Sequence, residues 1–121
     1  GSDGPPNDPM PRPRLWCAFP RLLGHYSREE KLFPLTTAIH KMTVLSAARF
    51  NLTDRGVVRE GSFADLVLFD PQTVAARATF AEPQQPAAGI EKTVMVNGII
   101  SYGEAIGATG RAGRFLRRAP N

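Results

Sequence analysis

Two β-rich arms flank the dipeptide Asn97-Gly98, which is the strongest folding signal in the sequence. Asn-Gly between such arms typically forms a two-residue hairpin turn, so we expect a β-hairpin over residues 91–101. Upstream, residues 65–69 contain an apolar run bounded by Asp70-Pro71, which predicts a buried strand. The chain is expected to supply three or four strands. Two or three strands with a hydrophobic face are marginal unless they pack on something, so the pattern indicates part of a larger sheet.

Helical periodicity comes before these strands. Apolar residues recur with helical spacing from Leu35 to Met42, and Pro34 suits the first turn of such a helix. Short helical segments are also expected over residues 19–26 and 47–52. The chain is therefore predicted to have about two helices followed by strands.

Positive charge is concentrated at the C-terminus. The 121 residues carry a formal net charge of +4, and four arginines in the last eleven residues account for all of it. These are Arg111, Arg114, Arg117 and Arg118. Nucleic-acid-binding proteins spread positive charge over a surface, so we expect no nucleic-acid partner. The tail is expected to be solvated or packed on other parts of a larger protein.

The cellular setting follows from simple features. No apolar run approaches the roughly 20 residues that a membrane span needs, and the start shows no secretion signal. The chain begins with Gly1 and not with Met, so we expect that residues precede it in the complete protein. Cys17 is the one cysteine and can form no internal disulfide, which fits a reducing compartment. These features predict a cytoplasmic protein with no membrane partner.

Asp3 and Arg14 are the residues whose surroundings point to chemistry. Asp3 stands in Gly-Ser-Asp-Gly, where the glycines leave its carboxylate uncrowded. Such a carboxylate can act as a general base or metal ligand, or it can cap a turn. Arg14 follows a Pro-rich stretch, and its planar guanidinium can bind a carboxylate with two hydrogen bonds. The alternative for Arg14 is an ordinary surface arginine.

The histidines and the cysteine do not suggest a metal site. His25 and His40 are fifteen residues apart, and neither has a Cys, His or carboxylate at the spacing of zinc ligands. His40 is expected to face solvent. Cys17 has no His partner at short range, which argues against a nucleophile. We therefore expect the two histidines and the cysteine to form no metal site.

A series of short motifs runs along the chain in a fixed order. They are Gly1-Ser2-Asp3-Gly4, Arg14-Leu15-Trp16, Phe19-Pro20-Arg21-Leu22-Leu23-Gly24, Lys41-Met42-Thr43, Ala47-Ala48-Arg49, Asp54-Arg55-Gly56, Gly61, Ala64-Asp65-Leu66-Val67-Leu68-Phe69-Asp70-Pro71 and Val96-Asn97-Gly98. Together they resemble the N-acyl-D-amino-acid deacylase (D-aminoacylase) family of the amidohydrolase superfamily, over nearly the whole chain. The Ala-Asp-Leu-Val block alone indicates only the superfamily, whereas its combination with the first 24 residues is far more specific.

The resemblance implies an α/β parent protein with a metal-dependent (β/α)8 TIM barrel and a small β-sandwich built from both chain termini. Residues 1–58 would form the end of the barrel, with the last active-site loop and the C-terminal helices. Residues 59–121 would supply C-terminal strands of the β-sandwich and the basic tail. The missing N-terminal part of the same protein would be the partner of this C-terminal portion.

The resemblance also implies a zinc-dependent hydrolase that cleaves N-acyl-D-amino acids into a carboxylate and a free D-amino acid. Asp3, near the metal, would take a proton from the zinc-bound water and pass it to the leaving amine. Arg14 would bind the α-carboxylate of the substrate. The zinc ligands would lie upstream, with none in this chain.

Several positions depart from the family pattern. They are Asn7, Met10 and Arg12 (usually histidines), Cys17 (usually Gly), Ala18 (usually Thr), and Pro34 with Thr37 (usually a Ser-x-x-Glu cap). These changes leave Asp3 and Arg14 in place but bear on loop shape and substrate preference. The alternative function is a non-catalytic remnant or interaction module derived from the amidohydrolase fold. As an isolated polypeptide the chain fits that alternative better, because it cannot assemble a metal site.

Overall fold

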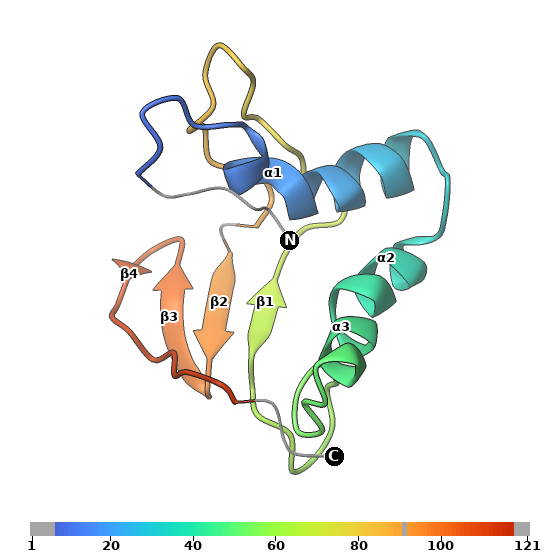
Figure 1. Cartoon of the computed structure of the whole chain (residues 1–121), viewed down its shortest axis with the longest axis vertical. Coiled ribbons are helices and arrows are strands. Elements are labelled where there is room, and N and C mark those ends of the chain that lie inside the picture. The colour runs from blue at the N-terminus through green and yellow to red at the C-terminus, as the bar shows by residue number, and fades with distance from the viewer. Residues whose placement is uncertain (1–6, 91, 118–121) are drawn as a thin grey trace. The chain divides into compact units, whose positions relative to one another are not determined.

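The computed structural model describes residues 7–90 and 92–117. The elements in chain order are α1 (Arg14–Arg21), the π-helical segment η1 (Leu22–Glu29), α2 (Leu35–Met42), α3 (Val44–Arg49), β1 (Leu66–Leu68), β2 (Thr93–Val96), β3 (Ile99–Gly103) and β4 (Gly107–Ala108) (Figure 1). Within the described ranges, no helix has the length and apolar character needed to cross a membrane.

Two compact units interleave along the chain. The first unit comprises Gly1–Ala38 with Phe69–Ile90, and the second comprises Ile39–Leu68 with Glu91–Asn121. The expected division between residues 58 and 59 concerns the domains of a longer protein, and it stays a prediction.

Helix α1 of the first unit continues directly into η1, because Leu22 at their junction keeps helical torsions (φ −61°, ψ −44°). The sequence predicted only a short helix over residues 19–26, so the observed helical stretch is longer at both ends. Pro20 lies inside α1 and cannot donate an α-helical hydrogen bond, and the wider π-helical turns follow it.

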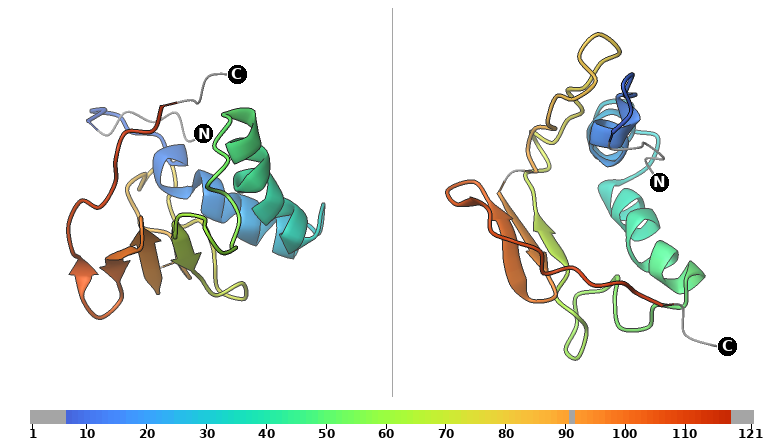
Figure 2. Two further views of the ribbon diagram at one scale, coloured as in Figure 1. Left: turned by 90° about the horizontal axis from the view of Figure 1, so that it is seen from below. Right: turned by 60° about the vertical axis from the view of Figure 1, so that its left-hand side comes forward.

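The segment 69–90 packs along this helical stretch within the first unit (Figure 2). Val74 is fully buried there, and Cys17, Leu23 and Ala88 are also buried. An antiparallel bridge joins Ala75 to Ala88 and closes the segment on itself. The apolar core of this unit is small. Hydrogen bonds from side chains to backbone carbonyls therefore contribute to how the helical stretch and segment 69–90 are held together.

Helix α2 begins after Pro34 as predicted, and the Pro34 carbonyl accepts hydrogen bonds from the first helical turn. Helix α3 lies three residues earlier than the predicted segment 47–52. It ends because Asn51 adopts a left-handed conformation (φ 56°) and the Leu52 N–H donates to the Ala47 carbonyl at 2.9 Å. This pattern is a Schellman cap, which here uses Asn in place of the more usual Gly.

The second unit contains a four-stranded antiparallel sheet in the order β1-β2-β3-β4. The predicted hairpin is confirmed, since Asn97 (φ 50°) and Gly98 (φ 80°) connect β2 to β3. Positive φ at both central residues defines a type I′ turn, which strongly favours Asn-Gly. The pairing shifts further along, where Val94 pairs with Tyr102 and Met95 with Ile100, so that a bulge interrupts the register.

Strand β1 forms where the sequence predicted it, but the buried environment expected for it is wrong. Leu66, Val67 and Leu68 are 39%, 52% and 63% exposed. Successive residues of a strand point to opposite faces of the sheet, so apolar side chains are open on both faces. The described residues do not supply enough apolar cover for this sheet.

Candidate functional site

Arg14 is an exposed residue at the first position of α1. The turn before it is built from local contacts, in which the Asp8 carboxylate accepts the Met10 N–H at 2.9 Å. The Pro13 carbonyl then accepts the Trp16 N–H at 3.1 Å and starts the helix. A helix N-terminus carries partial positive charge, so both the guanidinium and the helix favour an anion at this end of α1. Asp3 lies outside the described residues.

Two residues of η1 hold the helical stretch against segment 69–90. Arg28 donates hydrogen bonds to the Val74 carbonyl at 2.7 Å and to the Pro71 carbonyl at 3.1 Å. One turn earlier, Gly24 approaches the same Val74 oxygen so closely that a Cβ on it would lie 2.4 Å away. Any larger residue at position 24 would push the two segments apart.

A shallow hollow of about 510 Å³ lies in the first unit, between this segment and the stretch before α1. Pro11 forms one side, and residues 82–85 form the other. The Glu82 carboxylate in its wall accepts a hydrogen bond from Gln85. The carboxylate of Glu82 is thus already engaged by a neighbour, and Arg14 is not among the described residues that line the hollow.

The described residues contain no group of three or more His, Cys, Asp or Glu side chains that could hold a metal ion. The expectation that His25 lacks a suitably spaced carboxylate is wrong, because its Nδ1 lies 3.1 Å from Glu29 Oε2 on the next turn. That pair alone has too few ligands for zinc. His40 is exposed, as predicted. Cys17 is buried, with its Sγ 3.0 Å from the Pro13 carbonyl.

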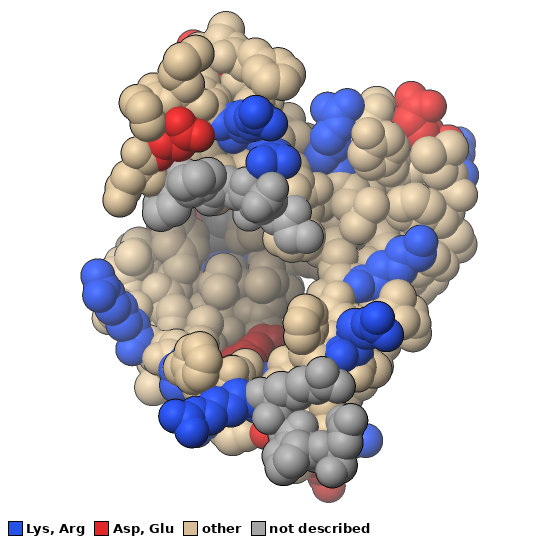
Figure 3. Space-filling view, in the orientation of Figure 1, with Lys and Arg blue, Asp and Glu red and all other residues tan. Residues whose placement is uncertain are grey.

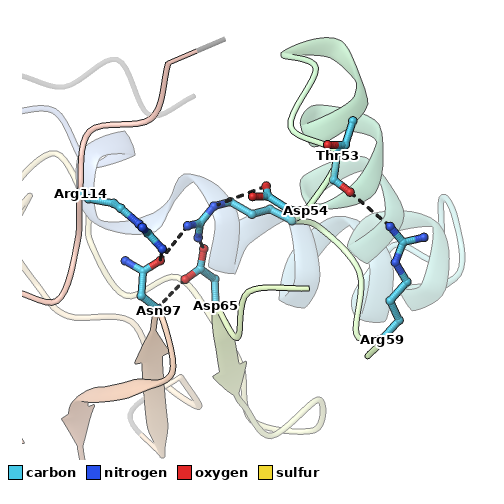
Figure 4. Close-up of polar contacts among 7 residues, drawn as sticks. Thr53, Asp54, Arg59, Asp65, Asn97 and Arg114 are labelled. Carbon is cyan, nitrogen blue, oxygen red and sulfur yellow. Dashed lines mark hydrogen bonds and ion pairs between the residues drawn. The ribbon is translucent and has the colours of Figure 1, made fainter. Parts of the chain in front are cut away.

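A polar network in the second unit was not predicted from the sequence. We call its members, Arg55, Asp65, Asn97 and Arg114, the polar clasp (Figure 4). Arg55 is buried, pairs with the Asp65 carboxylate and donates to the Asn97 side-chain oxygen at 2.7 Å. Asp65 also accepts the Asn97 backbone N–H at 2.8 Å. The clasp therefore ties β1 and the loop before it to the hairpin turn.

The clasp also holds the C-terminal segment. The Asn97 side-chain amide donates to the Ala112 carbonyl at 2.7 Å. The guanidinium groups of Arg55 and Arg114 each lie 4.3 Å from the centre of the Phe63 ring. Such cation–π contacts are worth about 0.5–1 kcal/mol at exposed sites and more when desolvated. Arg114 is exposed to solvent, as predicted for the tail, but these contacts also hold it beside Phe63 and Asn97.

Lys and Arg side chains are interspersed with acidic and uncharged residues within both units (Figure 3). The described C-terminal arginines Arg111, Arg114 and Arg117 are exposed, although Arg114 is engaged by the clasp. Arg118 lies outside the described residues. One of these arginines, Arg114, thus helps to hold the C-terminal segment in place.

The clasp makes stability depend on the ionisation of Asp65. Partial burial alone would raise the pKa of Asp65, but the hydrogen bonds from Asn97 and Arg55 and the nearby positive charges lower it below its usual value. A lowered folded-state pKa adds stability that is complete above the unfolded-state pKa of about 4. That stability is lost as the pH falls through the folded-state pKa.

We therefore expect Asp65→Asn, in the full-length protein, to lower stability at neutral pH by about 1.5 kcal/mol. This is the low end for hydrogen bonds to charged groups, chosen because the Asp65 side chain is 36% exposed. The difference in thermal midpoint between the two proteins should close as the pH falls below about 4. Asp54→Asn is the control, since Asp54 lies 4.0 Å from Arg55 and is 51% exposed. A constant difference at all pH values would contradict the role of the charge.

Comparisons with known proteins bear on both units. A sequence model described as "Amidohydrolase family" matches residues 1–102. D-aminoacylase from Alcaligenes xylosoxydans xylosoxydans is 56% identical over 118 residues, which is 98% of this chain and 24% of that protein.

Solved structures match over the same extent. One, described as "Crystal structure of D-aminoacylase defines a novel subset of amidohydrolases", is similar with a TM-score of 0.92 and 56% identity, covering 98% of this chain and 25% of that one. A second is N-acyl-D-glutamate deacylase from Bordetella bronchiseptica, complexed with zinc and a phosphonate mimic of the tetrahedral intermediate. It has a TM-score of 0.85 and 46% identity, with 98% and 24% covered. The chain spans about a quarter of the length of these relatives.

Proposed function

This chain belongs to the amidohydrolase family, and we propose from that premise that it is the C-terminal part of a hydrolase acting on the amide bond of N-acyl-D-amino acids. The observation that carries the proposal is the 56% identity to D-aminoacylase, sustained over 98% of the chain. Identity at this level over both units, and not over one motif, supports a shared activity for the complete proteins.

The proposed parent has a (β/α)8 barrel and a small β-sandwich. Residues 1–58 would end the barrel, and residues 59–121 would contribute strands to the sandwich. The support within this chain is the sheet of the second unit, whose apolar β1 side chains are open on both faces. Strands from another part of the protein would bury them, which is strongly stabilising.

Arg14 and Asp3 have complementary roles in this proposal. Arg14 binds the α-carboxylate of the substrate with two hydrogen bonds, aided by the partial positive charge at the start of α1. Asp3 accepts a proton from the attacking water as the new C–O bond forms, and it delivers that proton to the amine nitrogen as the C–N bond breaks. The products are a carboxylate and a free D-amino acid.

The described residues do not fit a zinc ion on their own, because no three suitable side chains come together. We propose that zinc belongs to the complete protein and that its ligands come from residues outside this chain, with Asp3 close by. A cytoplasmic location is also proposed, and it is supported by the single cysteine, Cys17, which is buried and unpaired with another cysteine.

The test compares the full-length protein with the isolated 121-residue chain. The full-length protein should hydrolyse N-acetyl-D-amino acids and not the L-forms, whereas the isolated chain should do neither and should bind zinc only weakly. Product amine release and zinc titration measure the two properties. Sub-micromolar zinc affinity of the isolated chain would contradict the proposal. Failure of the full-length, zinc-loaded protein to act on any D-substrate would favour the non-catalytic alternative.

A further inference from the structure

We infer that Arg28 is a positioning residue for Arg14: it fastens the continuous α1–η1 helix to the Val74 carbonyl and so fixes where Arg14 meets the substrate carboxylate. The inference rests on the proposed role of Arg14. Arg28 itself would touch neither the substrate nor the reacting atoms.

The tie to the Val74 carbonyl is specific in geometry. Arg28 reaches this oxygen at 2.7 Å and the Pro71 oxygen at 3.1 Å, so one guanidinium nitrogen joins two carbonyls of the same segment. Gly24 lies one helical turn before Arg28, and its lack of a side chain lets the helix approach the same oxygen. Attraction by Arg28 and close approach at Gly24 together set a single separation between helix and segment.

The anchor point is itself firmly held. Val74 is fully buried, and its N–H donates to the Asp70 carbonyl at 2.9 Å. The next residue, Ala75, exchanges two backbone hydrogen bonds with Ala88, at 3.2 and 3.0 Å. A carbonyl fixed on both sides in this way can serve as a reference for the helix that docks on it.

The helix can transmit the position of Arg28 to Arg14 because no break separates them. Helical torsions run through the junction at Leu22, so the backbone from Arg14 to Glu29 forms one continuous helical rod. Closer to Arg14, Cys17 Sγ makes a longer and weaker contact with the Ala78 carbonyl of segment 69–90, at 3.9 Å. Without the Arg28 tie, the rod is freer to slide or to turn about its axis, and either motion displaces Arg14.

A double-mutant cycle in the full-length protein tests this inference with an N-acyl-D-amino acid as substrate. Arg28→Ala should raise KM about tenfold with little change in kcat, since misplacement of a binding group by an ångström can cost up to about 100-fold. In an Arg14→Ala background, the same substitution should change KM by no more than about twofold, because the group it positions is already gone. Arg28→Lys should recover part of the loss, since an ammonium can still donate to the Val74 oxygen.

Two further variants sharpen the cycle. Gly24→Ala should reproduce the KM effect of Arg28→Ala, because its Cβ would clash with the same carbonyl. Arg21→Ala is the matched control. Arg21 lies in the same rod, but its guanidinium carbon is 5.5 Å from the centre of the Tyr26 ring, which belongs to that rod. The KM of the Arg21→Ala variant should change by no more than about twofold. If Arg28→Ala does not fold, judged by thermal unfolding, the cycle is run with Arg28→Lys and Gly24→Ala.

The outcomes separate the two proposals. If Arg28→Ala raises KM by the same factor in the original protein and in the Arg14→Ala background, the positioning role is overturned and a general structural role is indicated. An unchanged KM in Arg14→Ala alone would instead overturn the proposed function of Arg14. If KM rises in Arg14→Ala but stays unchanged in Arg28→Ala and Gly24→Ala, the proposed function of Arg14 stands and the positioning role of Arg28 is overturned.

Discussion

Asp3→Asn in the full-length protein should lower turnover by about 10²–10⁴-fold, the usual cost of losing a general acid–base group. The amide keeps the shape of the carboxylate but cannot accept a proton from the attacking water. The loss should lie at the upper end of the range if Asp3 both takes and returns the proton. The measurements are kcat on an N-acyl-D-amino acid and the zinc content, which should remain roughly unchanged.

The control for this substitution is Asp8→Asn, in the same N-terminal stretch. Asp8 holds a turn by accepting the Met10 N–H, and an Asn oxygen can accept the same bond. Its turnover should therefore stay within about twofold of the original. A rate for Asp3→Asn within about threefold of the original would show that Asp3 caps a turn and carries no catalysis.

The features that sequence alone predicted correctly are those fixed by neighbouring residues. Asn97 and Gly98 both tolerate positive φ, so the hairpin follows from two adjacent residues and their β-rich flanks. The helix after Pro34 similarly follows from a local apolar spacing. Neither prediction required knowledge of what packs against the element.

The sequence does not predict that a helix begins at Arg14, because the stretch before this residue is rich in proline. Pro13 precedes the helix, where its missing N–H costs nothing, and Pro20 is accommodated inside it. The Ser/Thr/Asp/Asn signal of an N-cap is also absent at Pro13. Arg14 therefore lies at the first position of a helix, which fixes its backbone more firmly than a loop would.

The polar clasp could not be inferred from local sequence. Arg55 binds Asp65 and Asn97, which are 10 and 42 residues away, and these contacts depend on the sheet having formed. Asn97 was sufficiently explained by its turn, and nothing in turn propensity reveals that its side chain also holds Ala112. Likewise, the apolar pattern of β1 predicts a strand but does not indicate which residues pack against it.

Arg14→Lys in the full-length protein should raise KM for the N-acyl-D-amino acid by about ten- to a hundredfold. A lysine keeps the positive charge, but its ammonium is a point charge and cannot form the paired hydrogen bonds of a guanidinium with a carboxylate. Because Arg14 sits at the first position of α1, the backbone should hold the new side chain in the same place. The change thus isolates the shape of the donor group from its charge and position.

The amide of the same substrate distinguishes carboxylate binding from a disturbance of the segment. It lacks the α-carboxylate, so it should be a poor substrate of the original protein and should lose little more in Arg14→Lys. Arg12→Lys is the matched control, since Arg12 is exposed two residues earlier, and its KM should stay within about twofold. Equal losses on the acid and the amide would show that Arg14 merely supports the segment, because a general distortion does not discriminate between substrates that differ only in that group.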